Sequence, residues 1–430
     1  MKPSFFASVS VVCFAVGIGS VVFADTTAYI ANSGADEVVR VTTDDEAMAT
    51  TPIAGGPYGI AVTPNGQQVL VTNVDDDELA FLDTDNFSGT PFLLAVGSSP
   101  RGVAIDPSGR YAYVANYDDD TISKIDVSQR ITTDTITVDD GPWGVAAHYD
   151  EPENTPVVYV ANHNDDSITV IDKDNQTTIL DVGDGPIGLA ITPDGAHVYV
   201  ANTNDDTVSI IDTRDLAVTD TVVVGSDPWG IAVGADGKYV YVTNSGANTV
   251  TVIQTADHSI ARTFTVGRQP RGVAAPRNGN FAYVINQNGG AISKIDMDDD
   301  TVTEFADGLI DGAYAIGAFI GSKPPSRPSG LELETRSANG IELRWIDNSA
   351  DEWGFKIERS KENEDNFIQI TTVVKNATTY RDFGLVDDTV YFYRIRSYNE
   401  AADSEFSVSA ESATKRFEGS VWCFIDTMKK

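Results

Sequence analysis

The stretch YVANTNDDTVSIID, from Tyr199 to Asp212, decides the fold, because related stretches recur along the first three quarters of the chain. Each copy contains a four-residue phrase that ends in asparagine, such as Tyr199-Val-Ala-Asn202. Seven such phrases occur 40 to 46 residues apart, ending at Asn32, Asn73, Asn116, Asn162, Asn202, Asn244 and Asn286. A repeat of nearly constant length predicts that one structural unit is used again and again.

The repeated unit is predicted to contain only β-strands. In the fifth copy, four short runs rich in Val, Ile, Thr and Tyr are bounded by Gly, Pro, Asn or Asp. These runs cover residues 187–192, 196–202, 206–212 and 217–225. No window shows a sustained helical period, which excludes a helical solenoid. Four strands in about 40 residues are typical of one blade of a β-propeller.

Both ends of the repeat region predict a closed ring. The first copy begins at the second strand of its blade, with Tyr29–Asn32, and lacks a first strand. The missing strand comes at the far end, in AYAIGAFIG at residues 313–321. A first blade completed by strands from both ends leaves no open sheet edge. Seven copies therefore predict seven blades.

A second phrase, Pro-x-Gly, marks the innermost strand of each blade. Its Gly and a following Ala suit strands that crowd around one axis. The variable residue falls at the mouth of the central channel, and it is Tyr58, Arg101, Trp143, Ile187, Trp229 and Arg271 in successive copies. The last copy loses the Pro and shifts its glycine to Gly312.

Aromatic residues and arginines at a concave rim are the types that dominate binding energy at recognition sites. We therefore predict a ligand-binding site formed by Tyr58, Arg101, Trp143, Trp229 and Arg271. The alternative is that these side chains only plug the channel.

The tetrapeptide, the turn and the Pro-x-Gly phrase recur in order, and in this they resemble the YVTN family of β-propellers. The resemblance covers residues 27–321. That family is known from surface-layer-type proteins of archaea and bacteria. The resemblance thus implies an all-β, seven-bladed propeller over residues 25–321 and a place at the cell surface.

The remainder of the chain is predicted to form a second domain. A Pro- and Ser-rich linker at 322–326 separates it from the repeats, and residues 327–414 show alternating strands. The phrase from Leu385 to Tyr391 resembles the tyrosine corner of a fibronectin type III domain, with Trp345 as its core indole. Residues 415–430 form a tail that contains Cys423. The fold class is therefore a propeller followed by an immunoglobulin-like sandwich.

The first 24 residues predict export. One Lys precedes an apolar run, and the small residue Ala24 ends a cleavage-type sequence, which is typical of a secretory signal peptide. The alternative is an uncleaved membrane anchor. After cleavage Cys423 is the one remaining cysteine, so no internal disulfide can form. We expect the mature protein to be secreted, at the cell surface or in the periplasm.

The charge restricts the partners. The net charge is −35, and residues 25–321 alone carry 45 acidic and 13 basic side chains. A field of this sign repels nucleic acids and anionic bilayers, so neither is an expected partner. Binding to a glycan, a peptide or another surface protein is the remaining expectation.

The sequence gives no catalytic motif. Covalent haem attachment needs a Cys-x-x-Cys-His motif, for which the mature chain lacks the cysteines. The four histidines, His148, His163, His197 and His258, are expected to be solvent-facing or in turns. The alternative to a binding protein is a lactonase- or lyase-like propeller enzyme with carboxylates in its central channel, because sequence cannot pair aspartates across blades.

Acidic loops follow the tetrapeptide in four copies. Turn chemistry and solubility are our first interpretation, since Asp and Asn stabilise left-handed turn positions. Adaptation to high salt is another. A weak calcium site is the metal-binding interpretation, because oxygen ligands at alternate residues suit a hard cation. Its candidate ligands are Asp75, Asp77, Asp118, Asp120, Asp166 and Asp206.

Overall fold

The structure, a computed structural model, describes residues 27–415 apart from 43–46, 151–154, 235, 276–280, 306–319, 322–325, 338, 350–353, 362, 364–365 and 399–403. Over these residues the chain is all-β. The predicted signal peptide, most of the linker and the Cys423 tail lie outside the described residues. No helix in the described part of the chain has the length and apolar character needed to cross a membrane.

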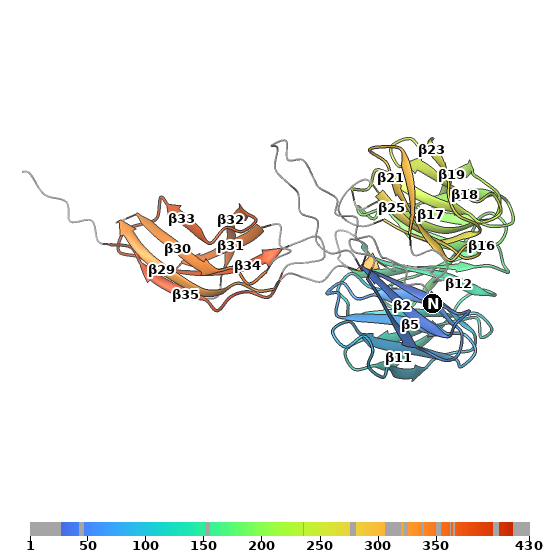
Figure 1. Cartoon of the computed structure of the whole chain (residues 1–430), viewed down its shortest axis with the longest axis horizontal. Helices are drawn as coiled ribbons and strands as arrows, with labels where there is room; N and C mark the ends of the chain where they lie inside the picture. Colours follow the sequence, from blue (N-terminus) through green and yellow to red (C-terminus); the bar gives the residue numbers. More distant parts are fainter. Residues whose placement is uncertain are drawn as a thin grey trace, which may run out of the picture.

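Seven four-stranded antiparallel sheets follow one another around an axis, which is the architecture of a seven-bladed β-propeller (Figure 1). Blade one contains β28 (Ile320–Gly321), β1 (Thr27–Asn32), β2 (Glu37–Thr42) and β3 (Met48–Pro52). Blade two contains β4 (Pro57–Val62), β5 (Gln68–Asn73), β6 (Glu78–Asp83) and β7 (Phe92–Ala95). Blade three contains β8 (Pro100–Ile105), β9 (Tyr111–Asn116), β10 (Thr121–Asp126) and β11 (Ile131–Thr137).

The remaining blades repeat this order from the axis outward. Blade four contains β12 (Pro142–Asp150), β13 (Thr155–Asn162), β14 (Ser167–Ile171) and β15 (Thr177–Asp181). Blade five contains β16 (Pro186–Ile191), β17 (His197–Asn202), β18 (Thr207–Asp212) and β19 (Ala217–Val223). Blade six contains β20 (Pro228–Val233), β21 (Tyr239–Asn244), β22 (Thr249–Gln254) and β23 (Ile260–Thr265). Blade seven contains β24 (Pro270–Ala274), β25 (Phe281–Asn286), β26 (Ala291–Asp296) and β27 (Thr301–Phe305).

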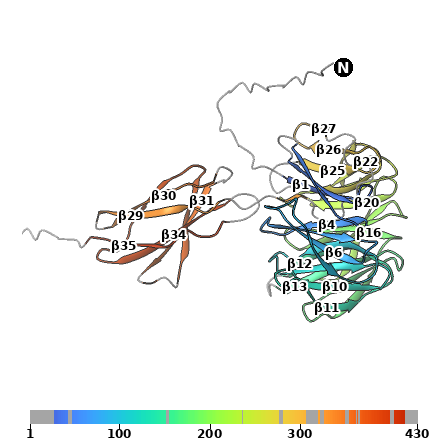
Figure 2. The same ribbon diagram turned by 60° about the horizontal axis from the view of Figure 1, so that its bottom comes forward.

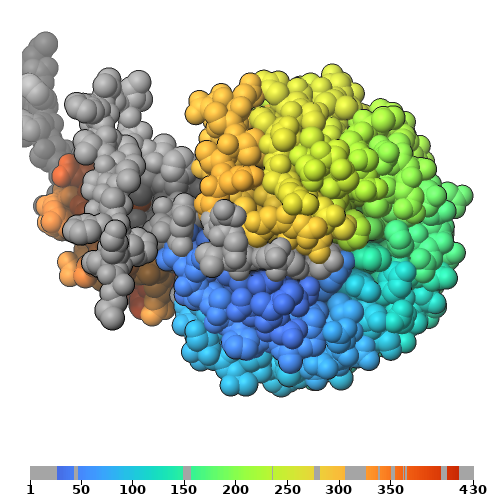
Figure 3. Space-filling model, turned by 45° about the vertical axis from the view of Figure 1, so that its right-hand side comes forward, coloured from blue at the N-terminus to red at the C-terminus, as the bar shows by residue number. Residues whose placement is uncertain are grey.

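The ring is closed where blade one meets blade seven. Strand β28 pairs antiparallel with β1, with Thr27 opposite Gly321 and Ala28 opposite Ile320. One hydrophobic core joins Ile30 of blade one to Ile285 of blade seven. The blue and orange ends of the repeat region accordingly lie side by side (Figure 3). The predicted closing strand at 313–321 is described at these last two residues, and its remainder lies outside the described part.

The recurring Gly of the inner strand has a steric cause. A Cβ atom on Gly144 would lie 2.0 Å from the carbonyl oxygen of Ile187 in the next blade. The same contact measures 2.1 Å from Gly59 to Arg101 and 2.2 Å from Gly188 to Trp229. No side chain fits at these distances, so each blade packs its backbone directly against the glycine of the blade before it.

The C-terminal domain is a sandwich of two sheets, separate from the propeller in Figure 2. One sheet contains β29 (Ser329–Ser337), β30 (Gly340–Ile346) and β33 (Thr379–Phe383). The other contains β32 (Ile368–Val374), β31 (Gly354–Lys361), β34 (Val390–Tyr398) and β35 (Ala410–Ala413). Trp345 is buried against Phe355, and the Tyr391 hydroxyl accepts a hydrogen bond from the Val386 N–H at 3.0 Å. The expected tyrosine corner is therefore present.

Candidate ligand-binding site at the channel mouth

The variable residues of Pro-x-Gly reach one face of the propeller because each inner strand contains a bulge. In blade four, Pro142 pairs with Asn162 and the next pair is Val145 with Val160, so one extra residue is inserted at Trp143-Gly144. The same shift follows the Pro in blades two to seven. A bulge re-aims the side chain at that position. The pairing also places each Pro-x-Gly phrase beside the asparagine of the tetrapeptide.

Arg101 is the centre of a cluster on this face. Its guanidinium carbon lies 4.9 Å from the ring centroid of Tyr58, 4.9 Å from that of Trp143 and 5.3 Å from that of Tyr117. Three blades contribute to this contact, since Tyr58 belongs to blade two and Trp143 to blade four. Cations on aromatic faces are attracted by the ring quadrupole. Tyr58 is 7% exposed, so its ring is largely covered and packs against Arg101.

The two rim tryptophans meet each other. Trp143 and Trp229 lie 5.7 Å apart at an interplanar angle of 89°, although they belong to blades four and six. Ile187 of blade five, which is 1% exposed, does not separate them. On the far side of Trp229, the Arg271 guanidinium lies 3.5 Å from the indole centroid, and its Nε donates to Gln287 Oε1 at 3.1 Å. The structure thus joins all five predicted rim residues in one cluster, which we call the rim cluster.

Sequence reasoning missed two members of the rim cluster. Tyr117 and His163 pack edge-on against Trp143, at 5.3 Å and 5.2 Å between ring centroids. Each directly follows the tetrapeptide asparagine, as Gln287 does in blade seven. That repeat position faces the Pro-x-Gly residue, so reading it around the ring would have identified both. His163 lies in a turn, as one of the two expected placements has it, and its ring is half-buried against an indole.

The rim cluster contains several buried polar atoms without hydrogen-bond partners. They are Arg101 Nε, Trp143 Nε1, Trp229 Nε1 and His163 Nδ1. A buried polar group that lacks a partner costs about 1–3 kcal/mol. Similar unpartnered atoms occur at the tetrapeptide asparagines and at Trp345 Nε1 in the C-terminal domain, so the contacts among the rings and guanidiniums, and not these atoms, distinguish the rim cluster.

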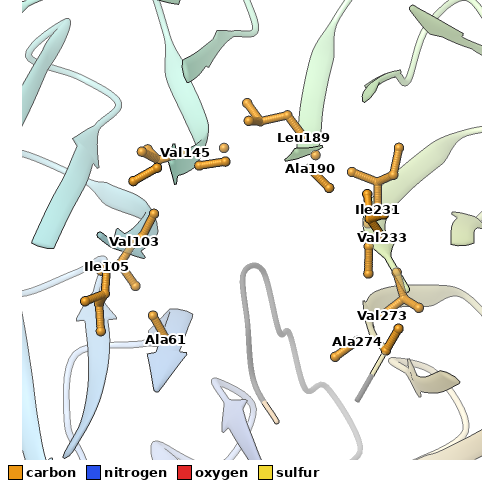
Figure 4. Close-up of a pocket in the computed structure, with 18 of the residues that line it drawn as sticks. Ala61, Val103, Ile105, Val145, Leu189, Ala190, Ile231, Val233, Val273 and Ala274 are labelled. Atoms are coloured by element: carbon orange, nitrogen blue, oxygen red, sulfur yellow. The ribbon is translucent and has the colours of Figure 1, made fainter. Parts of the chain in front are cut away.

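The central channel beneath the cluster is apolar. A cavity of about 310 Å³ is lined by Gly, Ala, Val, Leu and Ile from the inner strands of blades two to seven (Figure 4). The described wall contains no acid, base or nucleophile. The predicted alternative of a carboxylate site in the channel finds no carboxylate among these residues.

The acidic loops connect neighbouring blades. The fourth residue of each loop has a positive φ, for example 52° at Asp166 and 58° at Asp206. Its Oδ1 accepts the N–H of the residue before the next Pro-x-Gly: Gly185 N to Asp166 at 2.9 Å and Asp227 N to Asp206 at 2.9 Å. The same bond occurs from Ser99 to Asp77, from Gly141 to Asp120, from Gln269 to Asn248 and from Gly56 to Asp36. We call these contacts the blade latches.

The two other calcium candidates lie at the start of their loops. Asp118 accepts a hydrogen bond from the Ser99 hydroxyl, and Asp75 lies beside the backbone of Gly56. In the described part of the chain, no group of three or more His, Cys, Asp or Glu side chains is arranged to bind a metal. One oxygen, Oδ1, of each of Asp77, Asp120, Asp166 and Asp206 accepts a backbone N–H group. Calcium binding stays a prediction, and turn chemistry stays our first interpretation of these loops.

The other histidines lie away from the rim cluster and are half-buried. His197 of blade five and His258 of blade six meet between the two blades, with ring centroids 5.3 Å apart. The Tyr199 hydroxyl lies 2.9 Å from His258 Nδ1. Burial lowers the pKa of His258, and the neighbouring His197 lowers it further.

Comparison with known proteins agrees with this architecture. Residues 24–140 match a family model described as lactonase, 7-bladed beta-propeller, and residues 172–278 match one described as YNCE-like beta-propeller. Residues 326–413 match the fibronectin type III domain. The chain is a seven-bladed β-propeller with a C-terminal fibronectin type III domain. A search of curated proteins found no match.

Solved structures of several different proteins are similar to this chain. A functionally unknown protein from Desulfotomaculum acetoxidans is 16% identical, with a TM-score of 0.58 over 69% of this chain and 98% of its own. A streptogramin B lyase is 13% identical, with a TM-score of 0.52 over 60% of this chain and 86% of its own. Hydrazine synthase of Kuenenia stuttgartiensis is 18% identical, with a TM-score of 0.41 over 60% of this chain and 97% of its own. At these identities the likeness to the Desulfotomaculum acetoxidans protein and the streptogramin B lyase is one of fold alone.

Proposed function

We propose that this protein is an exported, non-enzymatic binding protein of the cell surface or envelope, which recognises a glycan, peptide or protein through the rim cluster. One observation carries the proposal: Arg101, Trp143, Trp229 and Arg271, from four different blades, meet in one cluster on the face where the Pro-x-Gly bulges lie. The recognition types Trp, Tyr and Arg dominate that face.

The fibronectin type III domain supports the same function. Its core is packed around Trp345 and Tyr393, and its residues take no part in the rim cluster. A separate sandwich after a propeller suits a spacer or a second adhesive module. The acidic surface favours solubility and disfavours nucleic acids and anionic bilayers as partners.

The test is a combined glycan and peptide array probed with the chain from residue 25 to its end. We expect specific binding that Trp229→Ala weakens by tenfold or more, since indoles at recognition sites are common hot spots. Arg214→Gln is the matched control, because Arg214 is exposed on the outer part of blade five. If no glycan or peptide on the array binds, and the protein turns over lactone or lyase substrates instead, the enzyme alternative replaces this proposal.

A further inference from the structure

The outermost strand of most blades carries a feature that opposes further strand pairing. Each of these strands pairs with one neighbour and leaves its other side open in the described structure. An open edge is a template for another strand, and proteins block it with charges, bulges or prolines. The outermost strand of blade one, β3, ends at Pro52. Those of blades three to seven each carry a charged residue: Asp134, Asp181, Asp220, Arg262 and Glu304.

Strand β7 of blade two lacks these features. Its residues, from Phe92 to Ala95, carry no charge and no Pro, and they pair with β6 without a bulge. Two of its side chains are exposed, Phe92 at 42% and Leu93 at 46%. On the side away from β6, no described strand pairs with it. An uncharged, apolar edge of this kind can accept an additional strand.

A cation lies beside this edge. The Arg130 guanidinium of blade three lies 5.1 Å from the ring centroid of Phe92 and 5.7 Å from that of Phe81. Its side chain makes no hydrogen bond and no ion pair with any described residue, in contrast to Arg262, which pairs with Asp300 at 2.7 Å. Arg130 can therefore pair with a carboxylate that arrives next to Phe92.

The two faces of β7 match different side chains. Phe81 and Phe92 are cross-strand partners, so both lie on the face that Arg130 covers. Successive residues of a strand point to opposite faces, so Leu93 lies on the other face. On an added strand, the residue opposite Phe92 meets Arg130, and the residue opposite Leu93 meets an aliphatic side chain. The edge thus fits an acidic residue next to an aliphatic one.

We propose that β7 is a docking edge for an extended peptide segment of a partner protein, in which an Asp or Glu opposite Phe92 is followed or preceded by an aliphatic residue opposite Leu93. Main-chain hydrogen bonds hold the segment, and the ion pair with Arg130 sets its register. A second copy of this chain is a poorer occupant. Two molecules with a net charge of −35 repel each other, and β7 of a second copy brings no acid to Arg130. This edge is separate from the rim cluster and does not depend on the function proposed for it.

The test titrates labelled peptides with the chain from residue 25 to its end and measures fluorescence anisotropy. The probe is the capped peptide Thr-Val-Glu-Val-Thr, which should bind about threefold more tightly than its Gln counterpart, as an exposed ion pair allows. Two further forms are N-methylated at alternate sets of amides. One should lose binding and the other should keep it, because only one edge of the peptide faces β7.

Variants of the protein locate the site. Leu93→Lys places a charge on the edge, as other blades do, and should weaken binding about tenfold. Ile179→Lys is the matched control, because Ile179 is 52% exposed on β15, whose edge already carries Asp181. Arg130→Gln should abolish the preference for Glu and leave binding of the Gln peptide unchanged. An unchanged melting temperature shows that each variant is folded.

Four outcomes would overturn the inference. Equal binding of the two N-methylated forms would contradict strand addition. A preference for Glu that survives Arg130→Gln would reject the ion pair. Dimerisation of the chain that Leu93→Lys abolishes would assign the edge to a second copy. Absence of binding by every peptide would reject the docking edge and leave the function proposed for the rim cluster untouched.

Discussion

At the scale of single residues, the acidic loops act through position more than through charge. The fourth loop residue adopts a left-handed conformation, which Asp and Asn tolerate better than other residues with a side chain. In that conformation its Oδ1 reaches the backbone of the next blade. Blade six uses Asn248 for the same latch, with Gln269 N at 2.8 Å. The neutral amide of Asn248 therefore accepts a backbone N–H group from the next blade, as the carboxylates do elsewhere in the ring.

The latch between blades four and five gives a prediction for Asp166. Asp166→Ala should lower the free energy of unfolding by about 1–2 kcal/mol, because it removes the acceptor of Gly185 N–H and strains the left-handed backbone. Asp166→Asn should have nearly the wild-type free energy of unfolding, because Asn248 forms the same kind of hydrogen bond in blade six. Urea denaturation measures both. Equal losses for the two variants would mean that charge, and not the latch, is what matters.

His258 gives a prediction on pH. Its pKa is lowered from 6.5, first by burial and then by His197. The unfolded chain therefore binds a proton more readily than the folded chain does. The stabilising effect of the neutral ring is complete above the unfolded pKa and is lost as pH falls through the lowered folded pKa.

NMR titration of the four histidine rings should give a pKa for His258 that lies below the ordinary value for histidine. His197→Ala should bring the pKa of His258 part of the way back, because it removes the second cause and leaves the burial. A His258 ring that titrates at or above the ordinary value would contradict the packing between blades five and six.

At the scale of elements, the inner strand depends on its glycine. Gly144→Ala should destabilise the propeller by about 1–3 kcal/mol or more, since its Cβ would lie 2.0 Å from the Ile187 carbonyl oxygen and that atom is backbone. Gly234→Ala is the matched control in blade six, where the nearest atom is 3.4 Å away. Thermal unfolding compares the two. A harmless Gly144→Ala would show that neighbouring blades can move apart.

Much of the element scale was predictable from sequence. Val, Ile and Tyr periodicity located the strands of the repeat, and the Pro-x-Gly phrase located the residues around the mouth. Sequence did not predict that Trp143 contacts Trp229 past Ile187, because the width of the mouth sets which blades meet. It also missed the blade latches, since they depend on how one blade twists against the next. Tyr117 and His163 were not predicted because their contacts with Trp143 depend on how the turn after each tetrapeptide folds over the rim.

At the scale of the whole molecule, closure of the ring is a testable property of residues 25–321. A chain that ends at Gly321 should melt well above one that ends at Gly308, because the shorter chain loses β28 and the pairing of Ala28 with Ile320. Circular dichroism melting measures the difference. Identical melting temperatures would refute closure through blade one.

The acidic surface as a whole predicts a response to ions in general. Salt screens repulsion between carboxylates over ~10 Å at 0.1 M. We expect the melting temperature to rise with NaCl as well as with CaCl2. A rise at micromolar calcium together with no effect of molar NaCl would establish a specific calcium site in the loops and overturn our ordering of the two interpretations.

The pairing of Thr27 with Gly321 also has a mechanical consequence. The chain enters and leaves the propeller at adjacent points, so a pull between the N-terminal side and the fibronectin type III domain does not run through the seven blades in series. It acts directly on one short pair of strands. Under load, β28 would therefore separate from β1 first. Blade one would open while the other six blades carry no force.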